Sequence, residues 1–559
     1  MKNIILTGFM GTGKTTIGLE LARQLRRLFL DMDTEIEARA GKSIERIFSE
    51  DGEAVFRGME TRLCQELSTQ QGLVIATGGG TLVAPDNRAL LLQNGIGICL
   101  DAHPDEIARR LQGTRHRPLL NVEDPKAEIE RLLAARREAY AALLWHIDTT
   151  GLSTRAVVQR AMEIAAVITL PVRSPDGTYE IHVGNGLLAH VGDAIRACGG
   201  GLGSPVALVA NPTVAQEYAG QVEASVRAAG LSPALCSIAD GEAYKTLDTV
   251  AGLYEQFLAG GLDRSGTVVA LGGGVTGDVA GFAAATYMRG LRLVQVPTTL
   301  LSMVDSSVGG KTGVDLPQGK NLVGAFKQPA VVLIDPSVLA TLPPEELRSG
   351  LAEVIKHGII GAPELFAELQ LGHGDLTSWW GDQGATHVAW ALEVKIEIVE
   401  DDPFEQGRRA VLNLGHTTGH ALERLSEYTL RHGEAVAIGM VAATQIAARM
   451  GRANPTLVDT VRDTLSAWGL PVRCPPYDVG AIWQAMEHDK KRRGKALRWV
   501  LPVAISRVEV TEDVPREVVT SVLQEMGASA GSTSPDRRTA RKPGAEQAVE
   551  KESIDRDDV

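Results

Sequence analysis

The chain has 559 residues, which exceeds what one hydrophobic core supports and, at roughly 150 residues a domain, suggests three or four domains. With 44% hydrophobic and 22% charged residues the composition is that of a globular protein, and the formal net charge of −13 argues against general nucleic-acid binding. The five cysteines are widely spaced without a C-x-x-C pair, which argues against a disulfide framework or a cysteine zinc site and favours a reducing cytoplasm.

Residues 1–166 alternate short apolar runs with helical segments, which is typical of a small α/β domain with a parallel sheet. We expect no signal peptide, because the first strand begins directly after Met1 and Lys2. No apolar run approaches the length of a membrane span, so we expect no membrane partner. The predicted strands are Asn3–Leu6, Leu28–Leu30, Val74–Ala76 and Gly97–Leu100.

The segment Gly8–Thr15 fits the G-x-x-x-x-G-K-[ST] pattern and lies between the first strand and a predicted helix over Thr15–Leu25. In such a loop, backbone N–H groups and the helix N-terminus surround phosphates, the lysine reaches the β- and γ-phosphates, and the hydroxyl ligates Mg²⁺. A chance glycine-rich turn is the alternative, and the flanking elements argue against it. The predicted ATP and Mg²⁺ site comprises Gly11, Thr12, Gly13, Lys14, Thr15 and Thr16.

Asp31 and Asp33 follow the strand Leu28–Leu30 and, on an extended chain, point in the same direction. One could help hold the metal while the other meets a substrate hydroxyl, although the pair taken alone is better explained as a polar strand end. Their neighbourhood favours the functional interpretation. Over residues 1–166 the chain resembles shikimate kinase, through Asp33, Phe56–Thr61, Gly78–Gly80, Arg117–Leu120 and Arg136.

The resemblance implies that Asp33, Arg57, Gly79 and Arg136 bind shikimate, with the arginines as partners of its carboxylate. Asp33 would accept a hydrogen bond from the attacking hydroxyl and act as its base. Asp31 would join Thr15 at the Mg²⁺ ion.

Arg117 would lie on a mobile lid, with residues 113–116 as its flexible part, and contact the ATP phosphates. Arg136 and Arg137 are adjacent, so either could face the substrate, and the spacing to Tyr140 favours Arg136. Another small-molecule P-loop kinase, such as a gluconate kinase, is the alternative against which the arginines argue.

After the first domain, residues 167–177 are rich in proline, serine and glycine and are predicted to be a linker. A second α/β region covers 172–335, with predicted strands near Val206–Ala210, Val268–Leu271 and Leu293–Val296. From 336 to 527 the chain becomes alanine-rich and helical, for example over Gly433–Met450, and a cleft is expected between the two lobes. Residues 528–559 lack apolar periodicity and are predicted to be disordered.

Glycine and histidine motifs mark this second half as a candidate catalyst. Gly272–Asp278 follows a predicted strand and suggests a close approach to a phosphate or dinucleotide, although a tight strand–helix turn would look the same. His416 and His420 share one face of a helix at a spacing that can chelate zinc. From spacing alone, the expected ligands are these two histidines and one acid.

Over about 172–527 the chain resembles 3-dehydroquinate synthase, whose motifs match Asp240–Lys245, Gly272–Asp278, Pro297–Leu300, Asp305–Gly313, Gly319–Asn321, Gly350–Gly358, Asn413–His420 and His432–Glu434. The resemblance implies a Rossmann-like α/β lobe for NAD⁺ and a mostly helical metal-binding lobe. It also implies that Glu353, His416 and His432 hold Zn²⁺ or another divalent metal such as Co²⁺. In that arrangement His420 is a catalytic group at the substrate rather than a ligand.

The resemblance further implies two sets of contacts. The cofactor set is Asp240, Glu242, Lys245, Gly273, Gly274, Val275, Gly277, Asp278, Thr298, Thr299, Lys311 and Lys320. The substrate set is Arg289, Asn321, Lys395, Arg409, Asn413 and Lys490, with Lys311 and Lys356 as catalytic groups. In an acidic chain, so many cations are best explained by an anionic ligand. In the family the residue matching Arg289 crosses a dimer interface, which implies a homodimer through this half.

Together the resemblances imply a bifunctional enzyme. It would phosphorylate shikimate with ATP and convert 3-deoxy-D-arabino-heptulosonate 7-phosphate to 3-dehydroquinate and phosphate, with NAD⁺ regenerated. Because these reactions are not consecutive, channelling is not implied. Another sugar-phosphate cyclase is an alternative that Lys395, Arg409 and Asn413 disfavour. A metal-dependent alcohol dehydrogenase is disfavoured by the metal ligands and the lysine-rich cleft, and a pseudoenzyme by the completeness of both sites.

Overall fold

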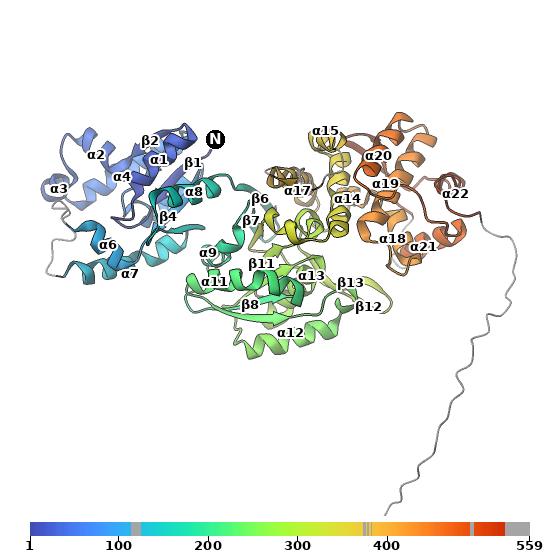
Figure 1. The fold of residues 1–559 in the computed structure, drawn as a ribbon, viewed down its shortest axis with the longest axis horizontal. Helices are drawn as coiled ribbons and strands as arrows, with labels where there is room; N and C mark the ends of the chain where they lie inside the picture. The colour runs from blue at the N-terminus through green and yellow to red at the C-terminus, as the bar shows by residue number, and fades with distance from the viewer. Residues whose placement is uncertain (113–123, 373–375, 377–379, 382, 492–496, 531–559) are drawn as a thin grey trace, which may run out of the picture.

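The computed structural model describes residues 1–112, 124–372, 376, 380–381, 383–491 and 497–530. Along the chain they form an N-terminal α/β unit, a central α/β unit and a mostly helical C-terminal unit, coloured blue, green and yellow to red (Figure 1). In the part of the chain that the structure describes, no helix combines the length and apolarity needed to cross a membrane.

The N-terminal unit is built on a parallel sheet in the order β2-β3-β1-β4-β5. Its central strand β1 is buried at every residue, as expected for a parallel strand covered by helices on both faces. The strands are β1 Asn3–Thr7, β2 Leu28–Asp31, β3 Leu73–Ala76, β4 Gly95–Asp101 and β5 Trp145–Asp148. The four strands predicted from the sequence are therefore observed.

Helices cover both faces of this sheet. They are α1 Lys14–Leu25, α2 Met32–Ala40, α3 Ile44–Arg46, α4 Glu53–Ser68, α5 Pro85–Leu92, α6 Pro104–Leu111, α7 Pro125–Ala141 and α8 Thr154–Ala165. One expectation is wrong here: Asp33 does not continue an extended strand with Asp31. Asp31 ends β2 and caps α2, where its carboxylate accepts from the backbone N–H groups of Asp33 and Thr34, so the chain turns helical at once.

The segment 167–177 forms secondary structure instead of the predicted linker. Strand β6 (Ile168–Ser174) pairs antiparallel with β7 (Gly177–Val183) at the edge of the central sheet. Pro171 is tolerated because an edge strand has one side without a hydrogen-bonded neighbour. The N-terminal unit therefore passes from α8 directly into the central sheet.

The central sheet has the order β6-β7-β14-β11-β10-β8-β9 and is parallel apart from the β6–β7 pair. Its other strands are β8 Pro205–Ala210, β9 Ser232–Ser237, β10 Thr267–Gly272, β11 Arg292–Pro297 and β14 Val331–Ile334. The helices of this unit are α9 Val191–Ala197, α10 Pro212–Val214, α11 Gly220–Ala228, α12 Leu247–Ala259 and α13 Gly274–Thr286. A separate hairpin, β12 Lys311–Leu316 and β13 Gly319–Phe326, projects beside α13 (Figure 1).

The C-terminal unit packs helices around α19 (His432–Arg449), which is apolar and buried along most of its length. The other helices are α14 Pro344–Ile360, α15 Pro363–Leu371, α17 Gly384–Asp401, α18 His416–Leu425, α20 Thr456–Ala467, α21 Val479–Lys491 and α22 Arg516–Glu525. A ribbon that the sequence did not predict, β15 Trp499–Ala504 and β16 Arg507–Thr511, packs on α19. Most of the predicted tail, 531–559, lies outside the described residues, and the buried Ala528 still belongs to the fold.

The first two units share one hydrophobic cluster, to which Trp145 of β5 belongs. The Trp145 indole contacts His182 and His190 of the central unit, with ring centroids 5.4 and 5.3 Å away. Arg196 of α9 donates to both carboxylate oxygens of Glu138 in α7, each at 3.1 Å. The two units are therefore packed against each other through side chains of both.

Candidate active sites

The P-loop of the N-terminal unit has the backbone that its glycines allow. Gly8, Gly11 and Gly13 have φ values of 126°, 82° and 98°, a region that favours glycine. At Gly8 a Cβ would lie 2.2 Å from the Leu100 carbonyl oxygen, so the loop also needs glycine for the close approach of β4. Gly13 then directly precedes α1, so the loop delivers an anion to a helix N-terminus.

The polar side chains of Lys14 and Thr15 form hydrogen bonds within and beside the loop. Lys14 Nζ donates to the carbonyls of Gly8 and Phe9 at 2.9 and 3.0 Å, so it is folded back over the loop. Thr15 Oγ1 donates to Asp31 Oδ2 at 2.7 Å. A hydroxyl and a carboxylate in contact beside the loop fit Mg²⁺ and its water shell.

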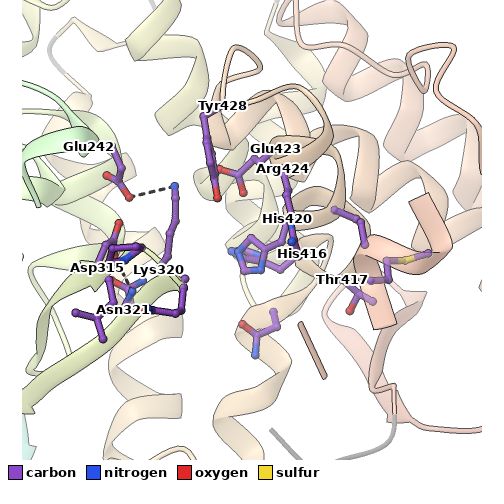
Figure 2. Close-up of a pocket in the computed structure, with 18 of the residues that line it drawn as sticks. Glu242, Asp315, Lys320, Asn321, His416, Thr417, His420, Glu423, Arg424 and Tyr428 are labelled. Carbon is purple, nitrogen blue, oxygen red and sulfur yellow. Dashed lines mark hydrogen bonds and ion pairs between the residues drawn. The ribbon is translucent and has the colours of Figure 1, made fainter. Parts of the chain in front are cut away.

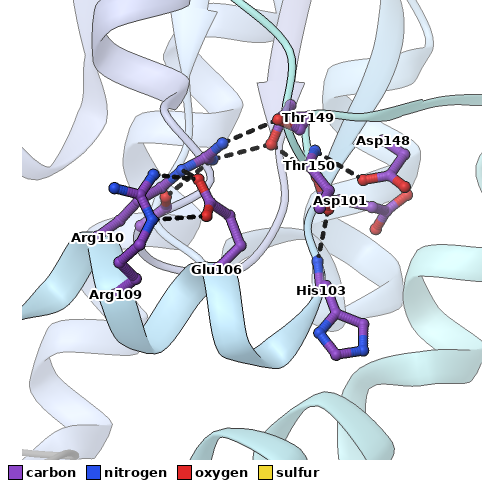
Figure 3. Close-up of polar contacts among 9 residues, drawn as sticks. Asp101, His103, Glu106, Arg109, Arg110, Asp148, Thr149 and Thr150 are labelled. Atoms are coloured by element: carbon purple, nitrogen blue, oxygen red, sulfur yellow. Dashed lines mark hydrogen bonds and ion pairs between the residues drawn. The ribbon is translucent and has the colours of Figure 1, made fainter.

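The remaining predicted loop residues support this arrangement. The Thr12 hydroxyl is buried and donates to the Phe9 carbonyl at 2.8 Å, while Thr16 is exposed in the first turn of α1. Arg110 of α6 holds the loop from outside, with its Nη1 3.4 Å from the Gly11 carbonyl oxygen and its Nη2 2.8 Å from that of Thr149 (Figure 3). Arg117 and the lid segment 113–116 lie outside the described residues.

The glycine triplet 78–80 is the meeting point of the predicted shikimate-binding residues. A Cβ placed on Gly78 would lie 2.8 Å from Asp33 Oδ1, and one on Gly80 would lie 2.7 Å from Arg57 Nη1. Arg136 Nη1 donates to the Gly79 carbonyl at 2.9 Å. The structure therefore brings Asp33, Arg57, Gly79 and Arg136 together beside the P-loop.

Of the two adjacent arginines, Arg136 contacts Gly79, whereas Arg137 is exposed. Tyr140, one turn further along, donates its hydroxyl to the same Gly79 carbonyl at 2.7 Å. Sequence reasoning missed Glu60, a buried carboxylate that accepts from Arg57 Nη1 at 2.7 Å. Its spacing of three residues from Arg57 on a helix was the available signal.

In the C-terminal unit, Glu353, His416 and His432 come from three different helices, α14, α18 and α19. The Nε2 atoms of His416 and His432 lie 3.8 and 3.5 Å from Oε1 of Glu353. The Glu353 side chain is fully buried and, among the described residues, its oxygens accept no hydrogen bond, although Lys356 forms an ion pair with Oε2. A buried carboxylate oxygen facing two imidazole nitrogens fits a divalent metal ion.

Two of the three groups are held in the protonation state that binds a metal. Burial, together with the charge of Lys356, lowers the pKa of His416 to about 3, and its Nδ1–H donates to the Leu414 carbonyl at 3.1 Å, which leaves the Nε2 lone pair free to coordinate. Burial alone would raise the pKa of Glu353, but the charges of Lys356 and the histidines hold it well below its usual range. At His432, burial is outweighed by the contacts with the Glu353 and Glu423 carboxylates, which raise the pKa to about 10, so this ring would release a proton when a metal binds. Glu423 lies 3.4 Å from Nδ1 of His432 and would orient that ring.

His420 occupies a different place from the one that spacing suggests. It is exposed, and its ring centroid is 5.1 Å from that of His416, but the group around the Glu353 carboxylate contains His432 instead. The group around Glu353 thus contains His416 and His432, while His420 belongs to a second group with Glu423 and His432. Spacing could not identify His432, because it lies on a different helix. Glu423 was also missed, although its place seven residues after His416 on the same helix face was an available signal.

A cavity of about 1070 Å³ opens between the central and C-terminal units. Figure 2 shows Lys320 and Asn321 of the β12–β13 hairpin on one side, and His416 and His420 of α18 on the other. Glu242 forms an ion pair with Lys320 at 3.1 Å, and Asn413 also lines the cavity. Predicted cofactor, substrate and metal residues therefore share one cavity.

Most predicted cationic groups around the cavity are held by acids. Lys311 pairs with Glu405 at 2.6 Å, and Lys395 with Asp305. Burial lowers the pKa of Lys395 to about 8 despite that partner. Lys356, Lys395 and Arg409 are buried, and Arg409 Nη1 donates to the Pro403 carbonyl at 2.7 Å. Asp305 and Glu405 were missed from the sequence, although Glu405 lies four residues before Arg409.

The predicted NAD⁺ residues cluster at the carboxyl ends of β10 and β11, where open α/β sheets bind ligands. Gly273 ends the turn into α13, and a Cβ there would lie 3.2 Å from Thr299 Cγ2, so the glycine leaves room above the helix N-terminus. Gly274, Val275, Gly277 and Asp278 form the first turns of α13, and Thr298 follows β11.

Lys245 links this loop to the hairpin. Its Nζ contacts Asp278 Oδ2 and Asn321 Oδ1, both at 2.5 Å. Burial raises the pKa of Asp278 to about 6 although Lys245 opposes the shift. Asp240 contacts Asn211 instead, its Oδ1 accepting from Nδ2 at 2.8 Å.

Of the predicted substrate residues, Asn321 and Asn413 line the cavity, whereas Arg289, Lys395 and Arg409 are not among the described residues that line it. Arg289 is exposed on the short turn Tyr287–Arg289, where Met288 and Arg289 have φ values of 49° and 68°. Lys490 lies in α21, but its side chain falls outside the described residues.

Comparison with known proteins assigns families to both halves. Residues 10–166 match the family model of shikimate kinase, and 235–349 and 350–492 match the models of the N-terminal and C-terminal parts of 3-dehydroquinate synthase. The 3-dehydroquinate synthase of Nostoc punctiforme is 46% identical over 359 residues, which are 64% of this chain and 98% of that protein.

Solved structures are similar to each half in turn. A 2-epi-5-epi-valiolone synthase from Streptomyces hygroscopicus with bound NAD⁺ and Zn²⁺ is 30% identical at a TM-score of 0.57, over 62% of this chain and 96% of that one. A shikimate kinase from Acinetobacter baumannii in complex with shikimate is 38% identical at a TM-score of 0.29, over 30% of this chain and 93% of that one.

Proposed function

Because the larger part of the chain belongs to the 3-dehydroquinate synthase family and a shikimate kinase domain precedes it, we propose that one polypeptide catalyses both reactions. The kinase transfers the γ-phosphoryl group of ATP to the 3-hydroxyl of shikimate. The synthase converts 3-deoxy-D-arabino-heptulosonate 7-phosphate to 3-dehydroquinate and phosphate.

In the kinase, the P-loop holds the nucleotide and the glycine triplet holds the acceptor. Lys14, now on the carbonyls of Gly8 and Phe9, would bind the phosphates, and Thr15 and Asp31 would hold Mg²⁺. Arg57 and Arg136 bind the shikimate carboxylate, since guanidinium groups match a carboxylate in charge and shape. Asp33, directed at the triplet, accepts the proton of the attacking hydroxyl.

In the synthase, Glu353, His416 and His432 would hold the metal, and the loop after β10 would hold NAD⁺. When bound, the metal supplies a Lewis acid at the substrate hydroxyls, and NAD⁺ supplies a hydride acceptor that is later regenerated. His420 stands beside the metal ligands at the cavity surface, where it can accept or return a proton. The remaining cationic groups bind the substrate anions, and these groups are Lys311, Lys356, Lys395, Arg409 and Lys490.

One observation carries the synthase assignment: the buried Glu353 carboxylate has an oxygen that no described group satisfies by hydrogen bonding and that two imidazole nitrogens face. The similarity of this half to a 2-epi-5-epi-valiolone synthase makes a related sugar-phosphate cyclase the second candidate function. Arg409 favours a carboxylated substrate, because its guanidinium is buried and donates to the neutral backbone carbonyls of Pro403 and Gly309, so an anion would compensate its charge.

The same resemblance supports a homodimer as the assembly. Arg289 is exposed on a turn in the left-handed region and has no place in its own cavity, which supports a homodimer in which it completes the partner's site. The described cysteines are all free, which supports a cytoplasmic location.

The proposal is tested by two assays on the purified full chain. The first follows ADP formation with shikimate and ATP–Mg²⁺. The second follows phosphate release and NADH absorbance together, with the heptulosonate phosphate, catalytic NAD⁺ and Zn²⁺, and repeats the measurement after chelation.

We expect shikimate-dependent ADP, and metal-dependent phosphate release without net NADH. Accumulating NADH would identify a dehydrogenase. Absence of phosphate release, with release from a non-carboxylated sugar phosphate instead, would identify another cyclase.

A further inference from the structure

His146, in strand β5, is a partly buried histidine that neither proposed reaction uses. Its Nδ1 lies 2.6 Å from Oδ2 of Asp101 and its Nε2 lies 3.2 Å from the backbone oxygen of Tyr140. A carboxylate and a peptide carbonyl only accept hydrogen bonds, so both ring nitrogens must donate. The geometry therefore describes a doubly protonated, positively charged ring.

This contact is a hydrogen-bonded ion pair rather than an empty metal site. Cys99, Asp101 and His146 are close enough to be considered as ligands. However, two ligand atoms on a tetrahedral zinc ion are about 3.3 Å apart, since each lies about 2 Å from the metal. The 2.6 Å separation of Nδ1 and Oδ2 is the length of a charge-assisted hydrogen bond.

The charged groups around the ring favour its protonation. Burial alone would lower the pKa of His146, but the hydrogen bond and charge of Asp101 outweigh it, Asp193 of α9 adds to them, and the pKa rises to about 9. On the packed elements β4 and α7, burial raises the pKa of Cys99 well above its usual range and that of Tyr140 to about 12. His146 is thus the group of this cluster that changes charge near pH 9.

The His146 ring connects α7, which carries Arg136 and Tyr140, to Asp101 of β4, whose hydrogen bonds lead to the P-loop. On one side, Tyr140 gives its carbonyl to His146 and its hydroxyl to Gly79, whose carbonyl also accepts from Arg136. On the other side, the Asp101 backbone oxygen accepts from the Thr149 hydroxyl at 2.9 Å.

Thr149 is in turn held by Arg110, which reaches the P-loop carbonyl of Gly11 (Figure 3). The ring is therefore the link between these two sets of hydrogen bonds.

Resting on the shikimate kinase activity proposed above, we infer that His146 is a positioning residue for that site. As an imidazolium between Asp101 and the Tyr140 carbonyl, it fixes the last turn of α7 and thereby places Arg136 and Tyr140 at Gly79. Loss of its proton removes one of the two donors, so the helix end loses a restraint and the arginine is less well placed for the substrate carboxylate.

The test uses the full chain and two independent readouts. Selective ¹³C-histidine labelling and NMR give the pKa of His146, assigned by the signal that the His146→Gln variant lacks. Steady-state ADP formation between pH 6.5 and 10 gives kcat and the KM values for shikimate and ATP. His190→Gln, which changes an imidazole at the same domain interface that is not bonded to Tyr140, is the matched control.

We expect His146 to titrate near pH 9 and the shikimate KM to rise through the same range while the KM for ATP stays constant. His146→Gln should raise the shikimate KM at pH 7 about five- to tenfold, as expected for a lost charge-assisted hydrogen bond, and should flatten its pH profile. His190→Gln should retain both the wild-type KM and its pH profile.

A His146 that titrates below pH 7.5 would overturn the inference. A variant with the wild-type shikimate KM would do the same. A general loss of folded enzyme lowers kcat and leaves KM in place, which separates it from positioning. If the wild-type chain does not phosphorylate shikimate, the proposed function fails, and the NMR titration still reports on the ion pair.

Discussion

Lys14 and His416 are single residues whose surroundings separate the two activities. Lys14 Nζ is bonded to two carbonyls of its own loop, and its replacement removes a charge without disturbing a core. His416 begins α18 in a buried cluster of the other unit, where its Nε2 faces Glu353. Each residue therefore tests one catalyst at a time.

Lys14→Ala should abolish ATP-dependent phosphorylation of shikimate, with a loss of kcat of at least about 100-fold, because the lysine stabilises charge on the transferred phosphoryl group. Phosphate release by the synthase should stay at the wild-type level. ADP and phosphate assays on the same preparation measure both. Loss of both activities in a folded protein would contradict independent sites.

His416→Ala should do the reverse, because it removes one of the three groups around the metal position. We expect the variant to contain less than about one-tenth of the wild-type zinc after dialysis, by analogy with the 10–100-fold affinity losses of altered metal shells. Shikimate phosphorylation should persist. Zinc at the wild-type level, measured by atomic absorption, would show that the ligands lie elsewhere.

His146 also makes the stability of the chain depend on pH. Its pKa is raised from 6.5 to about 9 in the folded state, so its stabilisation is complete below about pH 6.5 and is lost as the pH rises through 9. The full effect is on the order of 3 kcal/mol. Thermal melting between pH 6 and 10 should show this loss in the wild type and a flatter profile in His146→Gln.

At the scale of helices and strands, close contacts between helices set the metal cluster. Gly433 in α19 lies against α14, and a Cβ there would come within 1.9 Å of the Ser349 carbonyl oxygen. These two helices carry His432 and Glu353, so their separation determines the distance between two of the metal-facing groups.

Gly433→Ala should therefore weaken both folding and metal binding in the C-terminal unit, at a cost of about 3 kcal/mol or more, because neither backbone can yield cheaply. Gly220→Ala in α11 is the control, since a Cβ there meets nothing within 4 Å and alanine favours the helix by about 0.5–1 kcal/mol. Urea unfolding and zinc content measure the two effects. A Gly433→Ala variant as stable as the wild type would show that the helices can move apart.

At this scale, the elements that could be predicted from the sequence are those set by local signals, and those that were missed depend on contacts between residues far apart in the chain. The strand Val268–Leu271 and the loop after it were predictable, because a buried apolar run and its glycines are local signals. Strand β6 was missed because Pro171 suggests a break and only the edge position explains it. The role of His432 depended on contacts between three helices, so it was reached through family resemblance and not through spacing.

At the scale of the whole molecule, the kinase and synthase units are joined by a packed interface. Trp145 is 5% exposed although it belongs to an edge strand of the kinase sheet, because the central unit covers it. The ion pair between Glu138 and Arg196 adds a polar contact beside it. Apolar contact of this kind couples the unfolding of neighbouring units.

Trp145→Ala should uncouple the two units at a cost of about 3–5 kcal/mol, the usual range for a buried tryptophan. In calorimetry, a single transition of the wild type should divide into two, with the kinase unit melting first. Leu258→Ala changes a side chain that is 71% exposed and should leave the trace unchanged. Two transitions already present in the wild type would contradict the coupling.

Asp193, which belongs to the central unit, helps to raise the pKa of His146 in the kinase unit. A kinase unit expressed without the rest of the chain would therefore differ from the kinase unit of the intact protein. A kinase excised after residue 166 would lose that carboxylate and expose an indole, so its histidine would give up its proton at a lower pH than in the intact chain. Assays of the fragment would then report a shikimate affinity that falls away earlier in the alkaline range. The kinase sequence alone would then not give the full kinase activity, because the synthase half would act on it as a permanently attached subunit.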